Sequence, residues 1–260
     1  MKYLFTFLQR LYFIYAFSIF LIVMLLIFPF VLIASFFGKI RGGNITYRLC
    51  MLWGDIVFRL IFIFPKRLFE SPHDKNRSYI FVTNHISYVD ACLLVMAFRQ
   101  PLRVLGKIEM TRIPVFGFIY KNVVVTVDRS SLENRAQSFR IIKSLANKGI
   151  SVLFFPEGTF NKTGNPLKEF YNGAFRVAIE TQTPIKPVLF LDTYDIMPGG
   201  LASFNPNRGR CRILYLNEIP VTGMTVANVQ SLKRKVFDIM SEKLREYKAG
   251  WLPPSPKGGL

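Results

Sequence analysis

The chain has 260 residues, enough for one complete α/β domain with a further segment attached. Its formal net charge is +18, and 51% of its residues are hydrophobic, including 26 phenylalanines. A basic chain this apolar indicates an anionic membrane surface as partner, and the dispersed basic residues without a nucleic-acid motif argue against DNA or RNA. Cys50, Cys92 and Cys211 have neither metal-ligand spacing nor a matching histidine pair, so we predict no metal site and no disulfide framework.

The first predicted element is an uncharged apolar segment at residues 11–37. It exceeds the roughly 20 residues that a helix needs to cross a bilayer core. It lacks the small-residue cleavage site of a secretory signal, so we predict a retained membrane anchor. Pro29 divides it, which leaves either one tilted span or a helix that enters the membrane and turns back. Basic residues are slightly more numerous after the segment, which predicts that the rest of the chain lies on the cytoplasmic side of the inner membrane.

A second apolar segment, residues 49–64, carries Asp55 and Arg59, which are four apart and able to pair on a helix. Gly54 and these two charges make it a poor membrane span. We interpret it as an amphipathic helix lying at the membrane interface, the alternative being a helix that covers the core of the soluble domain. Residues 1–70 are therefore predicted to form the membrane-anchoring helices.

Beyond these helices, short apolar strands alternate with helical patterns. The predicted strands are residues 79–83, 102–106, 122–127, 150–155, 185–191 and 212–216, and the predicted helices are residues 87–96, 131–148, 173–181 and 229–247. Ser87 and Ser131 are typical helix caps, and Gly149 ends the second helix. The alternation predicts an α/β fold with a largely parallel central sheet covered by helices over residues 71–250, followed by a C-terminal tail at 251–260.

His85 and Asp90 form the first candidate pair. His85 follows the strand at 79–83, and Asp90 lies about one turn inside the next helix. Two positions five apart on one helix would point about 140° away from each other. A histidine that is still in the loop can instead fold back on the carboxylate, which gives a general base oriented by an acid, without a serine or cysteine nucleophile. The alternative is that Asp90 only stabilises the start of its helix.

Several chemically active residues follow the ends of predicted strands: His85, Lys107, Arg129 and Glu157. The carboxyl ends of parallel strands meet at one edge of a sheet, where ligands bind, so we expect these residues to converge. Lys107 and Arg129 suit an anionic head group, although each, taken singly, is more typical of a solvated surface charge. Glu157, Gly158 and Thr159 offer an acid, a close backbone approach and a hydroxyl, or else a simple turn. No GxSxG elbow, P-loop or GxGxxG is present in the sequence.

Four sequence blocks occur in order: NHISYVD at 84–90, GKIEMTRIPVFG at 106–117 with VDR at 127–129, FPEGTF at 155–160 and TPIKPVLF at 183–190. Together they resemble the glycerolipid acyltransferase family, typified by 1-acylglycerol-3-phosphate O-acyltransferase with its NHxxxxD motif. The resemblance implies a membrane-bound enzyme that moves an acyl chain from acyl-CoA or acyl carrier protein to the free hydroxyl of 1-acylglycerol-3-phosphate, making phosphatidic acid. It implies no cofactor, because the thioester donor is a co-substrate. Its partners are the bilayer, the lysophospholipid acceptor and the donor.

The resemblance also implies roles for individual residues. His85 is the expected general base, and Asp90 is the carboxylate expected to orient it. The residues expected to bind the acceptor are Asn84, Lys107, Arg129, Glu157, Gly158 and Thr159.

Phe160 departs from the family pattern, because the third block often reads FPEGTR, with the arginine on the acceptor phosphate. Either Arg129, Lys107 and Lys162 bind the phosphate instead, or the acceptor is another lipid, such as a phosphate-free lyso-ornithine or lyso-glycine lipid. Lys186 is a second departure, in the fourth block. A non-catalytic membrane-binding protein is a further alternative, which the intact histidine and aspartate of the first block argue against.

Overall fold

The computed structural model describes residues 2–128, 131–197 and 211–249. Its helices are α1 (Lys2–Ser35), α2 (Gly43–Leu60), α3 (Val89–Ala97), α4 (Phe116–Val123), α5 (Leu132–Asn147), α6 (Gly173–Glu180), α7 (Thr193–Ile196) and α8 (Val229–Glu246), with a π-helical turn at Gly38–Gly42 and 3₁₀ turns at Ile108–Arg112 and Val226–Asn228. Its strands are β1 (Lys66–Phe69), β2 (Ile80–Thr83), β3 (Leu102–Lys107), β4 (Val124–Val127), β5 (Ser151–Phe154), β6 (Ile185–Phe190) and β7 (Arg212–Tyr215).

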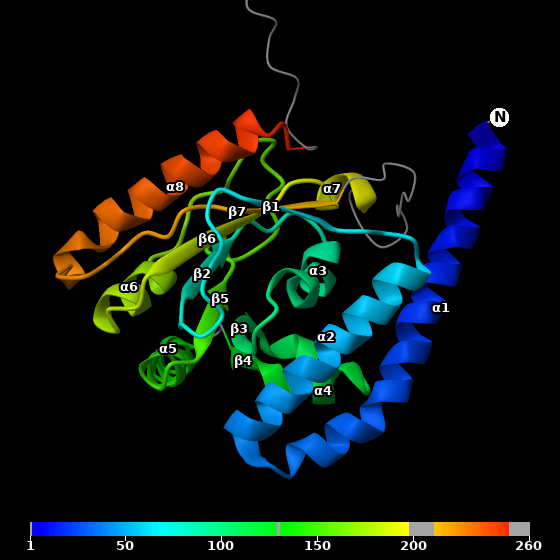
Figure 1. Cartoon of the computed structure of the whole chain (residues 1–260), viewed down its shortest axis with the longest axis horizontal. Coiled ribbons are helices and arrows are strands. Elements are labelled where there is room, and N and C mark those ends of the chain that lie inside the picture. The colour runs from blue at the N-terminus through cyan, green and yellow to red at the C-terminus, as the bar shows by residue number, and fades with distance from the viewer. Residues whose placement is uncertain (1, 129–130, 198–210, 250–260) are drawn as a thin grey trace, which may run out of the picture.

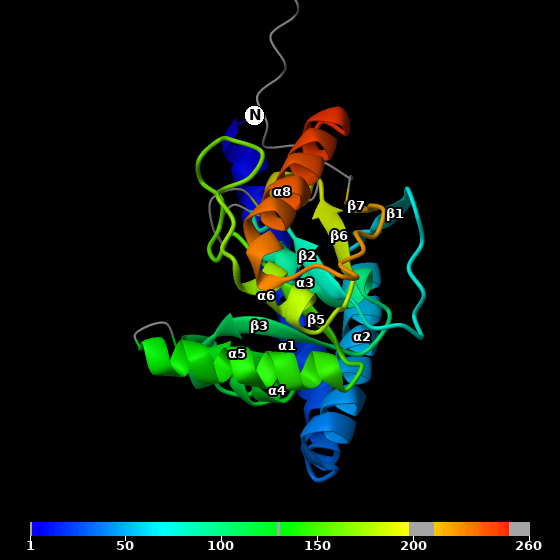
Figure 2. The ribbon, with the colours of Figure 1, turned by 90° about the vertical axis from the view of Figure 1, so that its left-hand side faces the viewer.

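The strands form one sheet in the order β1-β7-β6-β2-β5-β3-β4. Neighbouring strands run parallel, except β6 and β7, which are antiparallel. Helices α5, α6 and α8 cover one face of the sheet, and α2, α3 and α4 cover the other (Figures 1 and 2). Because both faces are covered, the central strands β2 and β5 are buried along their whole length. The predicted α/β fold with a largely parallel sheet is confirmed.

Two helix signals in the sequence are confirmed, and a third is displaced. The Ser131 hydroxyl accepts hydrogen bonds from the backbone N–H groups of Glu133 and Asn134 at the start of α5. Gly149 has φ +72°, the left-handed conformation that ends a helix without a Cβ penalty. Helix α3 begins at Val89 rather than at Ser87.

Two local predictions are wrong. Asn122 and Val123 end α4 instead of starting a strand, so β4 begins at Val124. Helix α4 packs against α1 through the edge-to-face rings of Phe118 and Phe28, and this tertiary contact favours a helix over the strand propensity of the valine. The edge strand β1 was not expected, because its four residues are mostly exposed and carry no alternating pattern; its pairing with β7 makes it a strand.

Helix α1 is the long apolar helix predicted from the sequence, and it continues through Pro29 without ending. Within the described residues, it alone is long and apolar enough to cross a membrane, over Thr6–Ser35 with a mean hydropathy of 3.0. One face is buried against the protein at Val23, Ile27 and Val31. The outward face is exposed and largely apolar, which suggests association with a membrane.

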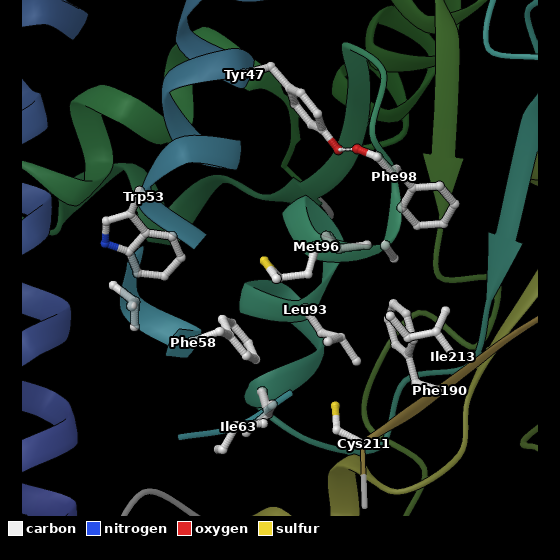
Figure 3. Close-up of a cluster of buried hydrophobic side chains, with 14 of the residues drawn as sticks. Tyr47, Trp53, Phe58, Ile63, Leu93, Met96, Phe98, Phe190, Cys211 and Ile213 are labelled. Carbon is white, nitrogen blue, oxygen red and sulfur yellow. Dashed lines mark hydrogen bonds between the residues drawn. The ribbon is translucent and has the colours of Figure 1, made fainter. Parts of the chain in front are cut away.

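Helix α2 runs back beside α1 and covers the core of the domain, the alternative raised from the sequence. Phe58 lies toward Leu93 of α3 (Figure 3), whereas Trp53 lies against α1, where its ring meets Phe20 edge-on at 4.9 Å between ring centroids. A Cβ on Gly54 would lie 2.8 Å from a methyl group of Val95, so glycine permits this close helix contact.

The pairing predicted between Asp55 and Arg59 is wrong. Asp55 forms a bidentate ion pair with Arg99, which follows α3, with N–O distances of 2.6 and 3.0 Å. The pair joins α2 to the loop that leads into β3. Sequence spacing alone could not reveal this partner, which lies 44 positions further along the chain.

Arg103 attaches the turn of the α1–α2 hairpin to the sheet. Its side chain is buried in β3, and one guanidinium nitrogen donates to the carbonyl oxygens of Lys39 and Ile40, both at 3.1 Å. Gly43 lies directly against it, since an added Cβ would come within 2.4 Å of the guanidinium. The buried cation therefore binds two backbone carbonyls of the turn between α1 and α2.

Candidate active site

The His85 ring lies against the Asp90 carboxylate at the carboxyl end of β2. The Nδ1 atom of His85 is 2.9 Å from Oδ2 of Asp90, although the chain separates the two residues by a loop and one helical turn. In the neutral tautomer that suits this contact, Nδ1–H donates a hydrogen bond to the carboxylate and Nε2 carries the free lone pair. The predicted folding back of a loop histidine onto Asp90 is what the structure contains.

Asp90 is held rigidly by the backbone around it. Its side chain is fully buried, and Oδ2 also accepts hydrogen bonds from the N–H groups of Ile86 and Ser87, at 2.7 and 2.9 Å. The carboxylate thus fixes the loop before α3 and orients the imidazole at the same time.

Glu157 ties the third sequence block to the first. Its buried carboxylate accepts from the backbone N–H of His85 at 2.9 Å with one oxygen and from that of Lys168 at 2.7 Å with the other. Burial raises the pKa of Glu157 to about 7, against the two backbone donors, which lower it. Asn161 completes the link, because its N–H donates to the carbonyl oxygen of His85 at 2.8 Å.

Aromatic rings enclose the imidazole on two sides. Phe155 stacks on the His85 ring with 4.0 Å between ring centroids, and Phe160 meets it edge-on at 4.3 Å. Phe160 also contacts the half-exposed ring of Tyr88, at 4.7 Å. This enclosure was not predicted from the sequence, although the two phenylalanines that bracket PEGT were a signal for it.

Asn84 is committed to the scaffold. Its side-chain amide donates to the carbonyl oxygen of Phe190 at 3.0 Å and accepts from the N–H of the same residue at 2.9 Å. The side chain is buried, so it joins the end of β2 to the end of β6. Because both amide groups are used, the geometry favours a positioning role over contact with an acceptor.

The remaining predicted site residues are less closely gathered. Gly158 adopts φ +71° in the turn after β5, and the hydroxyl of Thr159 accepts from Nζ of Lys168 at 3.1 Å. Lys107 is exposed at the end of β3, two strand spacings, or about 10 Å, from β2. Arg129 lies outside the described residues.

Lys186, the departure in the fourth block, belongs to a different part of the molecule. It is fully buried near the amino end of β6, whereas the candidate site lies at the carboxyl end. Its ammonium group donates to the carbonyl oxygen of Ser71 at 2.8 Å, and burial lowers its pKa. Lys186 therefore supports the loop after β1 rather than the site.

The assembled site can remove a proton from a hydroxyl group. An oriented imidazole presents Nε2, its partner carboxylate stabilises the ring when it becomes charged, and the aromatic rings limit the access of water. Among the described residues, no group of three or more His, Cys, Asp or Glu side chains is suited to holding a metal ion.

Comparisons with known proteins agree with the four sequence blocks. Residues 66–191 match a family described as Acyltransferase. A 1-acyl-sn-glycerol-3-phosphate acyltransferase of Haemophilus influenzae is 30% identical over 172 residues, which cover 64% of this chain and 68% of that protein. A chloroplastic protein of the same description from Brassica napus is 29% identical over 187 residues, covering 72% of this chain and 52% of the relative.

The chain spans about half the length of the two chloroplastic relatives that it matches, from Brassica napus and Arabidopsis thaliana. Among solved structures, PlsC, the 1-acyl-sn-glycerophosphate acyltransferase of Thermotoga maritima, aligns with a TM-score of 0.73. The alignment covers 97% of this chain and 100% of the other at 23% identity, which demonstrates a shared fold.

Proposed function

This chain belongs to the glycerolipid acyltransferase family, and we propose that it transfers a fatty acyl chain from acyl-CoA or acyl carrier protein to the free hydroxyl of 1-acylglycerol-3-phosphate, making phosphatidic acid. The observation that carries the proposal is the contact of 2.9 Å between Nδ1 of His85 and the buried Asp90 carboxylate. The names of the bacterial and plant relatives support this choice of acceptor.

In the proposed reaction, Nε2 of His85 takes the proton of the acceptor hydroxyl as its oxygen attacks the thioester carbonyl. The new carbon–oxygen bond forms, and the carbon–sulfur bond then breaks. The departing thiolate recovers the proton from the imidazolium, so the histidine returns to its neutral form. Asp90 stabilises the transient imidazolium and keeps Nε2 directed at the reacting atoms.

We further propose that α1 lies within one leaflet rather than crossing the bilayer. Trp53 of α2 donates to the carbonyl oxygen of Phe20 at the middle of α1, so α2 follows α1 along its apolar length. A crossing α1 would carry Arg48, Asp55 and Arg59 of α2 into the bilayer, at about 2.5–3.5 kcal/mol for each charge near its centre. An in-plane α1 keeps these charges near water. The excess of basic residues after the apolar segment supports the cytoplasmic leaflet.

A second candidate function differs in the acceptor. Phe160 occupies the position where the family often has a phosphate-binding arginine, and its ring packs on His85 and Tyr88. An aromatic wall beside the base favours an acceptor whose head group lacks phosphate at this point, such as a lyso-ornithine or lyso-glycine lipid.

One assay tests both candidates. The purified full-length protein is given palmitoyl-CoA with lysophosphatidate, lyso-ornithine lipid or lyso-glycine lipid in parallel, with the His85→Ala variant as the control. Transfer to lysophosphatidate above the control supports the first candidate. Transfer to an aminolipid alone replaces it with the second, and no transfer to any of the three contradicts both.

A further inference from the structure

The loop at residues 61–64, which joins α2 to β1, carries two phenylalanines that the fold leaves uncovered. Phe62 is 73% exposed and Phe64 is 65% exposed, whereas the alternating residues Ile61 and Ile63 are buried. The loop is therefore two-sided, because the isoleucines hold it to the domain and the two rings project from it.

Phe62 is also held in a backbone conformation that its side chain disfavours. Its N–H donates to the carbonyl oxygen of Arg59 at 3.1 Å. The N–H of Ile63 donates to the carbonyl oxygen of Phe58 at 2.9 Å, which completes the Schellman motif that ends a helix. This motif places the residue after the helix cap at positive φ, and Phe62 has φ +57°. Glycine is the usual residue there, since a Cβ is strained and a bulky side chain at positive φ is an outlier.

Other helix ends of this chain show what such a position normally holds. Helix α5 ends with the same two bonds, and the residue at positive φ is Gly149. Gln182 has φ +50° after α6, and there the side-chain amide donates to the carbonyl oxygens of Ile179 and Met224. The ring of Phe62 is mostly exposed, so little of its surface gains a contact within the domain. A strained side chain of this kind indicates a contact outside the folded chain.

The two rings lie beside the apolar helix α1. The hydroxyl of Tyr15 in α1 donates to the carbonyl oxygen of Leu60 at 2.8 Å. The hydroxyl of Tyr12 donates to the carbonyl oxygen of Ile61. Leu11, in the same part of α1, is exposed. The rings therefore extend the exposed apolar surface of α1 onto the loop that follows α2.

Basic side chains flank the rings along the chain. Arg59 precedes them, Lys66 follows them, and both are exposed. Aromatic rings between basic side chains suit the head-group region of a bilayer, where apolar surface meets anionic phosphates. Continuity with the apolar face of α1 favours lipid over a protein as the partner of this loop.

We propose that the loop at residues 61–64 is a second lipid contact, in which Phe62 and Phe64 enter the head-group region of the leaflet that holds α1. Arg59 and Lys66 bind lipid phosphates on either side of the rings. A single in-plane helix lets the domain roll about the helix axis, and a second contact beside it stops that motion. The inference rests on the in-plane position proposed for α1, because a crossing α1 would carry Arg59 into the bilayer.

Two glycine variants test the strain at Phe62. Phe62→Gly removes both the ring and the strained Cβ, so Tm of the full-length protein in detergent should rise by about 1–4 °C. Lys248→Gly is the matched control, because the exposed Lys248 has φ +50° in the same motif at the end of α8. We expect a similar rise in Tm for this variant.

Contact with lipid is measured by the fluorescence of Phe62→Trp and Phe64→Trp in full-length chains whose Trp53 and Trp251 are changed to phenylalanine. The vesicles contain phosphatidylcholine and phosphatidylglycerol with bromine on the acyl chains, either near the head group or near the bilayer centre. We expect the shallow bromine to reduce the emission of both reporters by about half or more, and the deep bromine to reduce it less.

Val226→Trp is the matched control for quenching. Val226 is 54% exposed in the turn before α8, which begins on the side of the molecule away from α1 (Figures 1 and 2). Its emission should be the same with and without bromine. The inference is overturned if Phe62→Trp is quenched no more than Val226→Trp. It is equally overturned if Phe62→Gly lowers Tm, since the ring would then serve the fold.

The measurements separate this inference from the proposals on which it rests. Quenching that is strongest with the deep bromine would contradict the in-plane position of α1 together with the loop contact. Equal depths along α1 with an unquenched Phe62→Trp would contradict the loop contact alone. Neither measurement uses acyl transfer, so an inactive protein with the expected quenching would contradict the proposed reaction and leave the lipid contact standing.

Discussion

Oε1 of Glu157 accepts a hydrogen bond of 2.9 Å from the backbone N–H of His85, across 72 positions of sequence. The other carboxylate oxygen accepts from the N–H of Lys168, and the side chain is completely buried. The glutamate of the FPEG block therefore has no exposed oxygen for an acceptor. We propose that Glu157 is a positioning residue, which fixes the backbone from which the histidine projects.

The Glu157→Gln variant tests this position through its pH dependence. Burial raises the pKa of Glu157 from 4.5 to about 7, so between these pH values the folded chain holds a proton that the unfolded chain has released. Stability of the wild type should consequently fall by about 3 kcal/mol as the pH rises through this window. The amide does not titrate, so Tm of the variant should lack this fall. Melting curves of both proteins between about pH 4.5 and about pH 8 measure the difference, and parallel curves would show that the carboxylate is not buried as described.

Variants of His85 and of Asp90 should both lose acyl-transfer activity, each for a different reason. His85→Ala should reduce acyl transfer by about 10²–10⁴-fold, because the proton acceptor is gone. Asp90→Asn should reduce it nearly as much, because the amide leaves the ring without its charged partner and favours the wrong tautomer. Initial rates with the best acceptor give the effect, and Tm values identify any general loss of folding. A folded His85→Ala protein with near wild-type turnover would remove the histidine from the mechanism.

A positive charge at position 160 should change which acceptor the enzyme prefers. Phe160→Arg introduces the guanidinium that the family often has, so kcat/KM for lysophosphatidate should stay equal or rise, by up to about tenfold relative to a lyso-ornithine lipid. Phe160→Ala is the companion variant, because it uncovers the imidazole without adding charge. Competition between the two acceptors in one assay measures the ratio. A ratio that moves toward the aminolipid in Phe160→Arg would contradict a phosphate site at this position.

Replacing Arg103 should lower the stability of the protein, because its side chain attaches the α1–α2 hairpin to the sheet. Arg103→Met retains apolar bulk but removes the charged donor that joins the carbonyls of Lys39 and Ile40 to β3. We expect a loss of about 1.5–3 kcal/mol in the free energy of unfolding, the usual contribution of hydrogen bonds from a charged group. Denaturant titration measures it, with Arg112→Met as an exposed control. Equal midpoints for the two variants would mean that water replaces the guanidinium at no cost.

The proposed in-plane position of α1 predicts equal depths along its exposed face. Spin labels are attached to cysteines that replace Leu8, Leu26 or Ile33, in a chain whose native cysteines are changed to alanine. An in-plane helix gives similar oxygen accessibility at all three positions. A crossing helix gives a maximum near the middle label and lower values toward the ends. The second pattern would restore the transmembrane alternative.

The sequence by itself determined the features that depend on neighbouring residues. The strands β2 and β5 follow from short apolar runs, and the cap at Ser131 follows from a side chain that bonds its own helix. The His85–Asp90 pair is also local, since a loop and a single turn join the two residues. The order of the four blocks was sufficient to identify the family.

Only the tertiary structure decided which apolar and polar surfaces meet. The amphipathic pattern of α2 predicts that one face is covered, and the packing of Gly54 against α3 shows that α3 covers it. The partner of Asp55, the bond from His85 to Glu157 and the packing of Phe160 on the imidazole join residues far apart in the chain. Hydrophobic burial is non-directional, so a sequence pattern predicts only that one face of a helix or strand will be covered. The packing of the helices on the sheet determines which element covers it.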